Sequence, residues 1–169
     1  ASAGVRRGDL VALPEMFETG FSMNVERTAD DADEGAAWMA STASRFGVTL
    51  MGGITRRRED GWGLNRAMAF DGAGRELGRY DKAHPFSFGR EAERFKGGDR
   101  VCVFEWKTPE NKGIARVCPI VCYDLRFPEL FRAGRMLGAE VFVVMANWPS
   151  ERGEHWLTLL RARAIENQA

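Results

Sequence analysis

Three residues with chemically useful side chains each follow a strand-like run. Cys122 comes after "VCPIV", Glu15 after "DLVALP", and Lys82 after "ELGRYD". A thiol of ordinary pKa is ionised to only a few per cent at neutral pH, so a nucleophilic cysteine needs a base or a cation beside it. A glutamate can take the thiol proton, and a lysine can stabilise a thiolate or an oxyanion. Each residue alone is ordinary at a strand end, but the combination indicates an activated nucleophile.

The stretch "VCPIVCYDLRFPEL", residues 117–130, places Cys122 at a turn between an apolar strand and a helix. In α/β folds such turns lie at the carboxyl end of the sheet, where binding and active sites are found. Backbone N–H groups near a helix N-terminus also stabilise a thiolate or an oxyanion. Cys102 and Cys118 lie inside strand-like runs instead. We interpret both as small buried packing residues.

A metal site or a disulfide fits the cysteines poorly. Cys118 and Cys122 do not have the spacing of a zinc-binding pair, and His84 and His155 are isolated in the sequence. A bridge between Cys118 and Cys122 would have to span too great a distance along one extended strand. We therefore expect no metal and no cofactor. Three cysteines, an odd number, fit a reducing compartment, so the expected location is the cytoplasm.

Composition limits the class of protein further. The chain has 169 residues, with Lys+Arg and Asp+Glu both 24 and a formal net charge of zero. That balance does not favour nucleic acid or an anionic membrane as a partner, and no apolar run is long enough to span a bilayer. We expect residues 1–169 to form a single domain. The chain opens just before a strand and stops within a helical pattern, so the domain is expected to be partial.

The hydrophobic pattern predicts helices that alternate with buried strands. Strands are expected at 9–15, 48–54, 100–106, 113–121 and 140–146, and helices at 30–46, 127–137 and 153–168. Residues 64–82 contain two strand-like runs around "DGAG", which predicts a hairpin, and "KTPENK" is the expected turn between two later strands. Residues 83–99 are expected to be a loop. Together these elements predict an α/β layered fold with a mixed sheet.

Three motifs in order resemble the catalytic segments of one known family. "LPEMFETGF", "YDKAHPFSF" and "VCYDLRFPEL" are similar to those of the nitrilase (carbon–nitrogen hydrolase) superfamily. The resemblance implies a four-layer αββα sandwich with mixed sheets, in which Glu15 is the base, Lys82 the lysine and Cys122 the nucleophile. The strand and helix that the family has before "LPE", and the strands that it has after "AIENQA", are absent from this chain.

The resemblance also implies supporting roles. Glu91 corresponds to a second glutamate that orients the lysine; the alternative for Glu91 is a solvated loop carboxylate, with Glu93 two residues away. The backbone N–H of Tyr123, together with Lys82, would form the oxyanion hole.

Three further residues are implied to contact substrate. Asn147 and Trp148, in "ANWP", would approach the pocket; without the resemblance they are a turn residue and a core or interface aromatic. Arg126 would bind a substrate carboxylate, or it pairs internally with Asp124 or Glu129, an interpretation that we favour slightly.

Within the superfamily the segments look most like the ω-amidase branch. That likeness implies a cysteine amidase that converts a small amide, such as 2-oxoglutaramate, to an acid and ammonia, and a homodimer or higher homo-oligomer. One alternative is an N-carbamoyl-amino-acid amidohydrolase with the same triad. Another is a non-catalytic interaction module that retains the fold, although retention of all three catalytic residues argues against it.

Overall fold

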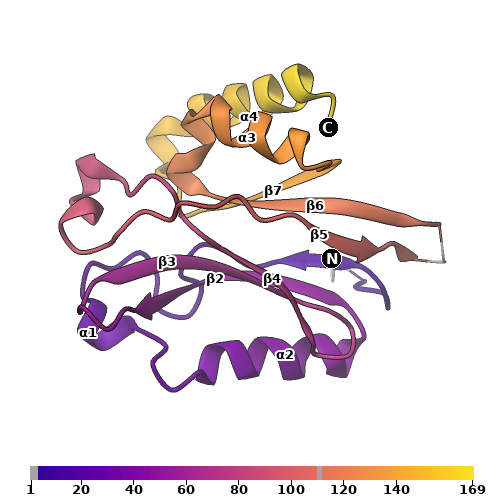
Figure 1. The fold of residues 1–169 in the computed structure, drawn as a ribbon, viewed down its shortest axis with the longest axis horizontal. Coiled ribbons are helices and arrows are strands. Elements are labelled where there is room, and N and C mark those ends of the chain that lie inside the picture. Colours follow the sequence, from indigo (N-terminus) through magenta and orange to yellow (C-terminus); the bar gives the residue numbers. More distant parts are fainter. Residues whose placement is uncertain (1–3, 110–111) are drawn as a thin grey trace.

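Two sheets stack face to face between two layers of helices. The computed structural model describes residues 4–109 and 112–169. One sheet has the order β1-β2-β3-β4, formed by Leu10–Ala12, Thr49–Arg57, Gly63–Phe70 and Glu76–Asp81. The other has the order β5-β6-β7, formed by Phe104–Lys107, Ile114–Val121 and Val141–Met145. Figure 1 shows α2 (Glu34–Phe46) outside the first sheet, and α3 (Pro128–Met136) and α4 (Gly153–Asn167) outside the second.

This arrangement confirms the predicted αββα sandwich. Both sheets are mixed, because β1 pairs with β2 and β6 with β7 in parallel, whereas the other neighbouring strands are antiparallel. A one-turn helix α1 (Val25–Thr28) and short 3-10 turns at Ser87–Gly89 and Glu91–Glu93 were not expected. Within the described ranges, none of the helices combines the length and apolar character needed to cross a membrane.

The predicted hairpin is formed by β3 and β4, and its turn follows from the sequence "DGAG". The Asp71 carboxylate accepts backbone N–H bonds from Ala73 and Arg75, both at 2.9 Å. Gly74 has a φ of 78°, a left-handed conformation that glycine adopts without steric cost. The hairpin matters for function because β4 leads directly into Lys82.

Helix α2 begins later than its sequence predicts. The helical pattern was expected from Asp30, but the Asp30 carboxylate accepts the backbone N–H groups of Gly35 and Ala36 from outside the helix, both at 3.1 Å. These bonds satisfy donors that the first turn leaves without partners. The helix ends, as expected, at Gly47, whose φ is 63°.

Strand β6 separates two apolar cores by the alternation of its side chains. Val117 and Val121 belong to the cluster between the sheets, whereas Cys118 and Ile120 belong to the cluster under α3 and α4. Cys118 has no exposed surface and packs as the sequence predicted. Burial raises the pKa of its thiol to about 12, so it stays protonated at neutral pH.

Cys102 is half-buried but does not lie in a strand, so that part of the prediction is wrong. The strand expected at 100–106 begins only at Phe104, because its pairing with β6 runs from Phe104 to Lys107. Cys102 lies in the preceding extended segment, against Gly78 of β4. The turn expected at "KTPENK" falls partly outside the described residues, at positions 110 and 111.

Candidate active site

Glu15 is fixed at the end of β1 by the neighbouring strand β2. The backbone N–H of Leu13 donates to the Met51 carbonyl at 2.8 Å, and the N–H of Gly53 donates to the Pro14 carbonyl at 3.1 Å. A Cβ atom at Gly53 would lie 2.9 Å from the Cα of Glu15, so only glycine allows this approach of the two backbones. Glu15 is thereby held in the interior with no exposed surface.

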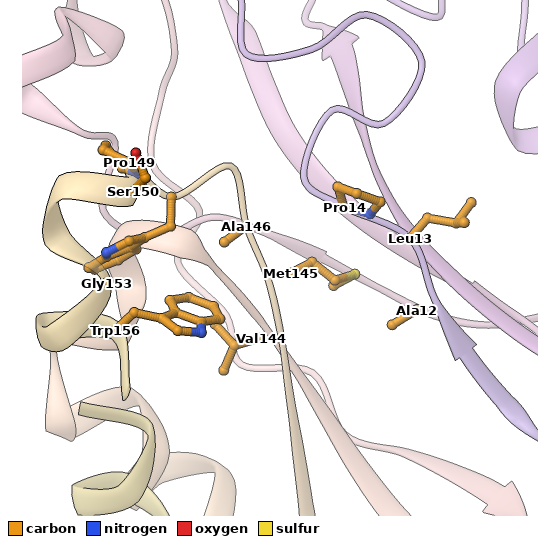
Figure 2. A pocket seen from close by; sticks show the side chains of 11 residues that line it. Ala12, Leu13, Pro14, Val144, Met145, Ala146, Pro149, Ser150, Gly153 and Trp156 are labelled. Carbon is orange, nitrogen blue, oxygen red and sulfur yellow. The ribbon is translucent and has the colours of Figure 1, made fainter. Parts of the chain in front are cut away.

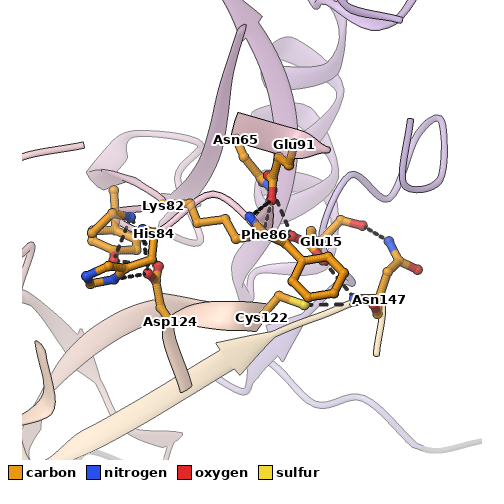
Figure 3. Close-up of polar contacts among 11 residues, drawn as sticks. Glu15, Asn65, Lys82, His84, Phe86, Glu91, Cys122, Asp124 and Asn147 are labelled. Carbon is orange, nitrogen blue, oxygen red and sulfur yellow. Dashed lines mark hydrogen bonds and ion pairs between the residues drawn. The ribbon is translucent and has the colours of Figure 1, made fainter. Parts of the chain in front are cut away.

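Lys82 lies between two buried carboxylates (Figure 3). Its Nζ donates to Glu15 Oε1 at 2.9 Å and to Glu91 Oε2 at 2.7 Å. Lys82 is 1% exposed, and neither glutamate has exposed surface. The alternative of Glu91 as a solvated loop residue is therefore wrong, because the 3-10 turn that carries Glu91 points its side chain inward.

The charge of Lys82 depends on these two partners. Burial by itself lowers the pKa of the Lys82 ammonium, because a charge is less stable away from water. Attraction to Glu15 and Glu91 outweighs burial and raises that pKa above its ordinary value. The site therefore contains a permanent cation at neutral pH.

Cys122 faces this cluster from the end of β6. It begins a 3-10 turn, Cys122–Arg126, with a φ of 48°, which is uncommon for a residue other than glycine. Strain of this kind occurs at sites where neighbouring structure over-determines the backbone. Burial raises the pKa of the thiol, the Glu15 carboxylate raises it further through charge and a hydrogen bond, and Lys82 opposes both. The thiol is therefore protonated at rest and lies beside a carboxylate.

Asn147 connects the end of β7 to the same cluster. Its backbone N–H donates to Glu15 Oε2 at 2.9 Å, and its Nδ2 donates to the Glu15 carbonyl at 2.5 Å. Its own carbonyl oxygen lies 3.8 Å from the Sγ of Cys122. Asn147 therefore contacts both Glu15 and Cys122 and is more than a turn residue.

A small pocket of about 100 Å³ opens beside the Cys122 thiol. Its lining includes four aromatic residues and two arginines, and consists of Phe21, Phe86, Cys122, Tyr123, Arg126, Asn147, Trp148, Pro149 and Arg152. The Tyr123 ring packs against Phe86 with centroids 5.0 Å apart. All four residues expected near substrate or the oxyanion (Tyr123, Arg126, Asn147 and Trp148) thus reach this pocket.

Arg126 does not form the internal pair that the sequence favoured. Its guanidinium lies over the Trp148 ring, 5.2 Å from the centroid, and its NH2 group is 3.3 Å from His155 Nδ1. Asp124 is already occupied: its carboxylate accepts hydrogen bonds from Tyr80 and from residues 83 and 84. The Arg126 side chain is therefore available to the pocket that it lines.

The Asp124 contacts tie the Cys122 turn to the Lys82 segment. Asp124 Oδ2 accepts from the Tyr80 hydroxyl at 2.7 Å and from the Ala83 N–H at 3.2 Å, and Oδ1 accepts from the His84 N–H at 2.9 Å. Burial raises the pKa of Asp124, and the bonds from Tyr80 and His84 oppose that rise. Sequence reasoning missed this network, although "YD" directly after the cysteine was a visible signal.

A larger groove of about 450 Å³ runs along the ends of β1 and β7 (Figure 2). It shares Trp148 and Pro149 with the smaller pocket. Its lining is Ala12, Leu13, Pro14, Val144, Met145, Ala146, Trp148, Pro149, Ser150, Gly153 and Trp156. None of Glu15, Lys82 and Cys122 belongs to that lining. Of these two, only the smaller pocket is lined by Cys122. In the described part of the chain, no cluster of three or more His, Cys, Asp or Glu side chains is placed to hold a metal ion.

The whole segment from residue 2 to residue 169 matches the family model described as carbon-nitrogen hydrolase. The chain belongs to the carbon-nitrogen hydrolase family. Omega-amidase YafV of Yersinia enterocolitica is 38% identical over 165 residues, which cover 98% of this chain and 60% of that protein. The 2-oxoglutaramate amidase of Bacillus subtilis is 34% identical over 165 residues, covering 96% of this chain and 61% of that protein.

A solved structure shows that the similarity of this carbon-nitrogen hydrolase to its relatives includes the fold. A CN-hydrolase superfamily protein from Xanthomonas campestris, with an arsenic adduct in its active site, is 36% identical with a TM-score of 0.81. The match covers 94% of this chain and 60% of that one. The chain therefore spans about three fifths of the length of the relatives that it matches.

Proposed function

We propose that the protein is an amidase that hydrolyses a small carboxylate-bearing amide through an acyl-enzyme on Cys122. One observation carries the proposal: a protonated thiol at a strained turn lies beside Glu15, which is itself ion-paired at 2.9 Å to the buried Lys82. A buried carboxylate–ammonium pair next to a thiol provides a base, a cation and a nucleophile in one place.

Acylation begins with transfer of the Cys122 proton to Glu15. The thiolate sulfur attacks the amide carbon, and the carbonyl electron pair becomes an oxyanion. The Lys82 ammonium and the backbone N–H of Tyr123 stabilise that oxyanion. When the tetrahedral intermediate collapses, the C–N bond breaks, the nitrogen takes the proton from Glu15, and ammonia leaves a thioester behind.

Deacylation repeats the sequence with water as the nucleophile. Glu15 accepts a proton from water as the hydroxyl attacks the thioester carbon, and the same two donors stabilise the second oxyanion. The C–S bond then breaks, and the proton returns from Glu15 to the Cys122 sulfur. The net reaction consumes one amide and one water and gives one acid and one ammonia.

The raised pKa of the Cys122 thiol explains why a base is required in this mechanism. A thiol that burial and Glu15 keep protonated does not attack until its proton is removed. Because Glu15 already accepts hydrogen bonds at both oxygens, its orientation is set before substrate arrives. Glu91, bonded to the same ammonium at 2.7 Å, holds Lys82 in place.

The pocket supports a small acidic amide as substrate. Its volume of about 100 Å³ suits a short acyl chain, and its walls include Phe21 and Trp148. Arg126 and Arg152 line the same pocket, so a carboxylate at the far end of the substrate would meet guanidinium groups. With two relatives named omega-amidase and 2-oxoglutaramate amidase, we infer that 2-oxo acid amides such as 2-oxoglutaramate are the substrate class.

Ammonia release from three compounds tests this function. The full-length protein is incubated with 2-oxoglutaramate, with an N-carbamoyl amino acid and with an uncharged amide of similar size. We expect turnover of the first, much slower turnover of the uncharged amide, and none in a Cys122→Ala variant. Preference for the N-carbamoyl compound would establish the amidohydrolase instead, and no turnover of any compound would favour a non-catalytic module.

The Arg126→Met variant provides the matched test of substrate recognition, because Met keeps the length of the side chain without its charge. We expect a KM for 2-oxoglutaramate raised at least about tenfold, in line with the loss of a charge-assisted bond, and unchanged turnover of the uncharged amide. An equal loss for both amides would mean that Arg126 supports the pocket without binding the carboxylate.

Assembly and location complete the proposal. Met136, Leu137, Leu157 and Ile165 are exposed apolar residues on or beside α3 and α4, which favours burial of this face in a homodimer or higher homo-oligomer. Three free cysteines favour the cytoplasm. Analytical ultracentrifugation of the full-length protein tests the assembly, and cell fractionation tests the location.

A further inference from the structure

Asn65, in strand β3, contacts three members of the cluster at once. Its Nδ2 donates to Glu15 Oε1 at 2.7 Å and to Glu91 Oε1 at 2.9 Å, and its backbone carbonyl accepts the N–H of Lys82 at 2.9 Å. Figure 3 shows the Asn65 side chain beside Glu91, directed toward Glu15. Asn65 is 2% exposed. No motif in the sequence pointed to this residue.

The orientation of the Asn65 amide follows from its donors. Its Oδ1 is buried and has no hydrogen-bond partner among the described residues. The reverse orientation would direct Oδ1 at two carboxylates, which only accept hydrogen bonds. The amide is therefore held by what it donates to the two glutamates.

The charges around Asn65 explain why a neutral side chain with two N–H donors is useful at this position. The groups that face Asn65 are Glu15, Glu91 and Lys82, with the Cys122 thiol beside Glu15. One ammonium faces two carboxylates, so the cluster has an excess of negative charge that hydrogen-bond donors can stabilise. Two N–H bonds stabilise both ionised forms without adding a second cation that would compete with Lys82.

We propose that Asn65 is a positioning residue that clamps Glu15 and Glu91 in their ionised forms and aims Glu15 at the Cys122 thiol. Asn65, in β3, and Lys82, just after β4, hold Oε1 of Glu15, and the Asn147 N–H holds Oε2. A carboxylate fixed at both oxygens cannot turn away from the sulfur. The role of Glu15 as base rests on the proposed function, but the clamp itself is measurable without an amide substrate.

Alkylation of Cys122 by iodoacetamide across a pH series measures the clamp directly. The rate is followed in the full-length protein by mass spectrometry of the Cys122 peptide, so labelling of Cys102 does not interfere. Asn65→Asp keeps the shape of the side chain but exchanges the double donor for a carboxyl group. The new carboxyl group either stays ionised and adds negative charge beside Glu15 and Glu91, or takes up a proton itself. In both cases the cluster binds a proton at a higher pH than it does in wild type. Asn65→Ser is neutral and keeps a single donor.

Asn167 offers a matched control. Like Asn65, it is 2% exposed, has an unpartnered Oδ1, and donates through Nδ2, here to the Arg163 carbonyl at 2.9 Å. Asn167 lies at the C-terminal end of α4 and does not contact the cluster residues through any of these bonds. Asn167→Asp therefore reproduces the burial of an acid without touching the proposed clamp.

We expect the alkylation profile of Asn65→Asp to move to higher pH by at least about one unit, the size of shift that a close like charge produces. Asn65→Ser should move the profile less in the same direction, and Asn167→Asp should leave it unchanged. On 2-oxoglutaramate, kcat should fall at least about tenfold in Asn65→Asp, which corresponds to one pH unit of lost ionisation. KM should stay near wild type, because Asn65 does not line the pocket.

Profiles for Asn65→Asp and Asn65→Ser that superimpose on wild type would overturn the clamp, as would an equal displacement in Asn167→Asp. If Asn65→Asp does not fold, the Asn65→Ser profile decides alone. A displaced profile in a protein that hydrolyses no amide would remove the proposed function and leave the clamp supported. Normal amide turnover with an undisplaced profile would support the proposed function and overturn the clamp.

Discussion

Replacing Lys82 by Met should weaken the fold as well as abolish activity. Lys82 Nζ lies 2.9 Å from one buried carboxylate and 2.7 Å from another. At an effective dielectric constant of about 20, each contact represents a Coulomb attraction of about 6 kcal/mol, most of which offsets the loss of hydration. Removing one member of a buried pair costs about 3–5 kcal/mol, because the remaining charge has no partner. That is a large part of the stability of an ordinary domain.

The loss of stability in Lys82→Met should depend on pH in a defined direction. Without the ammonium, Glu15 and Glu91 repel each other in the interior, so folding favours their protonated forms, whose pKa in the folded variant rises above the unfolded value of about 4.3. A group with a raised folded pKa contributes stability below its unfolded pKa and loses it as pH rises. The deficit relative to wild type should therefore be largest at neutral pH and shrink toward pH 5.

Urea unfolding of wild type and Lys82→Met at neutral pH and near pH 5 measures both effects. The double variant Lys82→Met/Glu91→Gln should recover part of the neutral-pH loss, because one unpaired charge is removed. Lys96→Met serves as the control: Lys96 is an exposed cation 3.8 Å above the Trp62 ring, and its loss should cost no more than about 1 kcal/mol. An Lys82→Met deficit that is no larger than the control, or that is independent of pH, would refute the reasoning.

Three further predictions concern other parts of the site. Asp124→Asn directs an NH2 group at donors that the carboxylate now accepts, so unfolding free energy should fall by about 1–3 kcal/mol and kcat should fall with it, as measured by urea unfolding and ammonia release. Because the raised pKa of Cys118, about 12, lies above its unfolded value, stability should fall as pH rises past about 8.5, by about 1.4 kcal/mol per pH unit for this thiol; Cys118→Ala should show a slope smaller by that amount. Glu15→Gln keeps the size of the side chain but removes the proton acceptor, so single-turnover mixing should show neither acylation nor deacylation in a protein that still folds.

The order of elements and the three converging residues were predictable, because both depend on local patterns. Strand-like runs alternate with helical ones, and the residues that follow three strand ends meet where those ends meet. The predicted and observed bounds of an element differ most where pairing between strands sets the bound. Strand β5 starts later than predicted because its register with β6 begins only at Phe104. Turn chemistry also set the start of α2, where Asp30 caps the helix from outside.

The surroundings of the triad were not predictable from local pattern. Asn65 lies in the strand "GLNRAMAF", where a polar residue is usually on the solvent side, and its role depends on glutamates 50 and 26 positions away. Asp124 was considered only as a partner for Arg126, whereas it bonds Tyr80, 44 positions earlier. The sequence suggests that strand-end charges are exposed. The stacking of two sheets buries them, which depends on contacts that no single segment encodes.

Rapid-quench mass spectrometry of the full-length protein tests the central claim that Cys122 forms an acyl-enzyme. The protein is mixed with excess 2-oxoglutaramate, quenched in acid within a few milliseconds to seconds, and digested. The account predicts an added mass equal to the amide minus ammonia on the Cys122 peptide, absent in Cys122→Ala and released as acid on longer incubation. Steady ammonia production with no adduct on Cys122, or with the adduct on another residue, would contradict it.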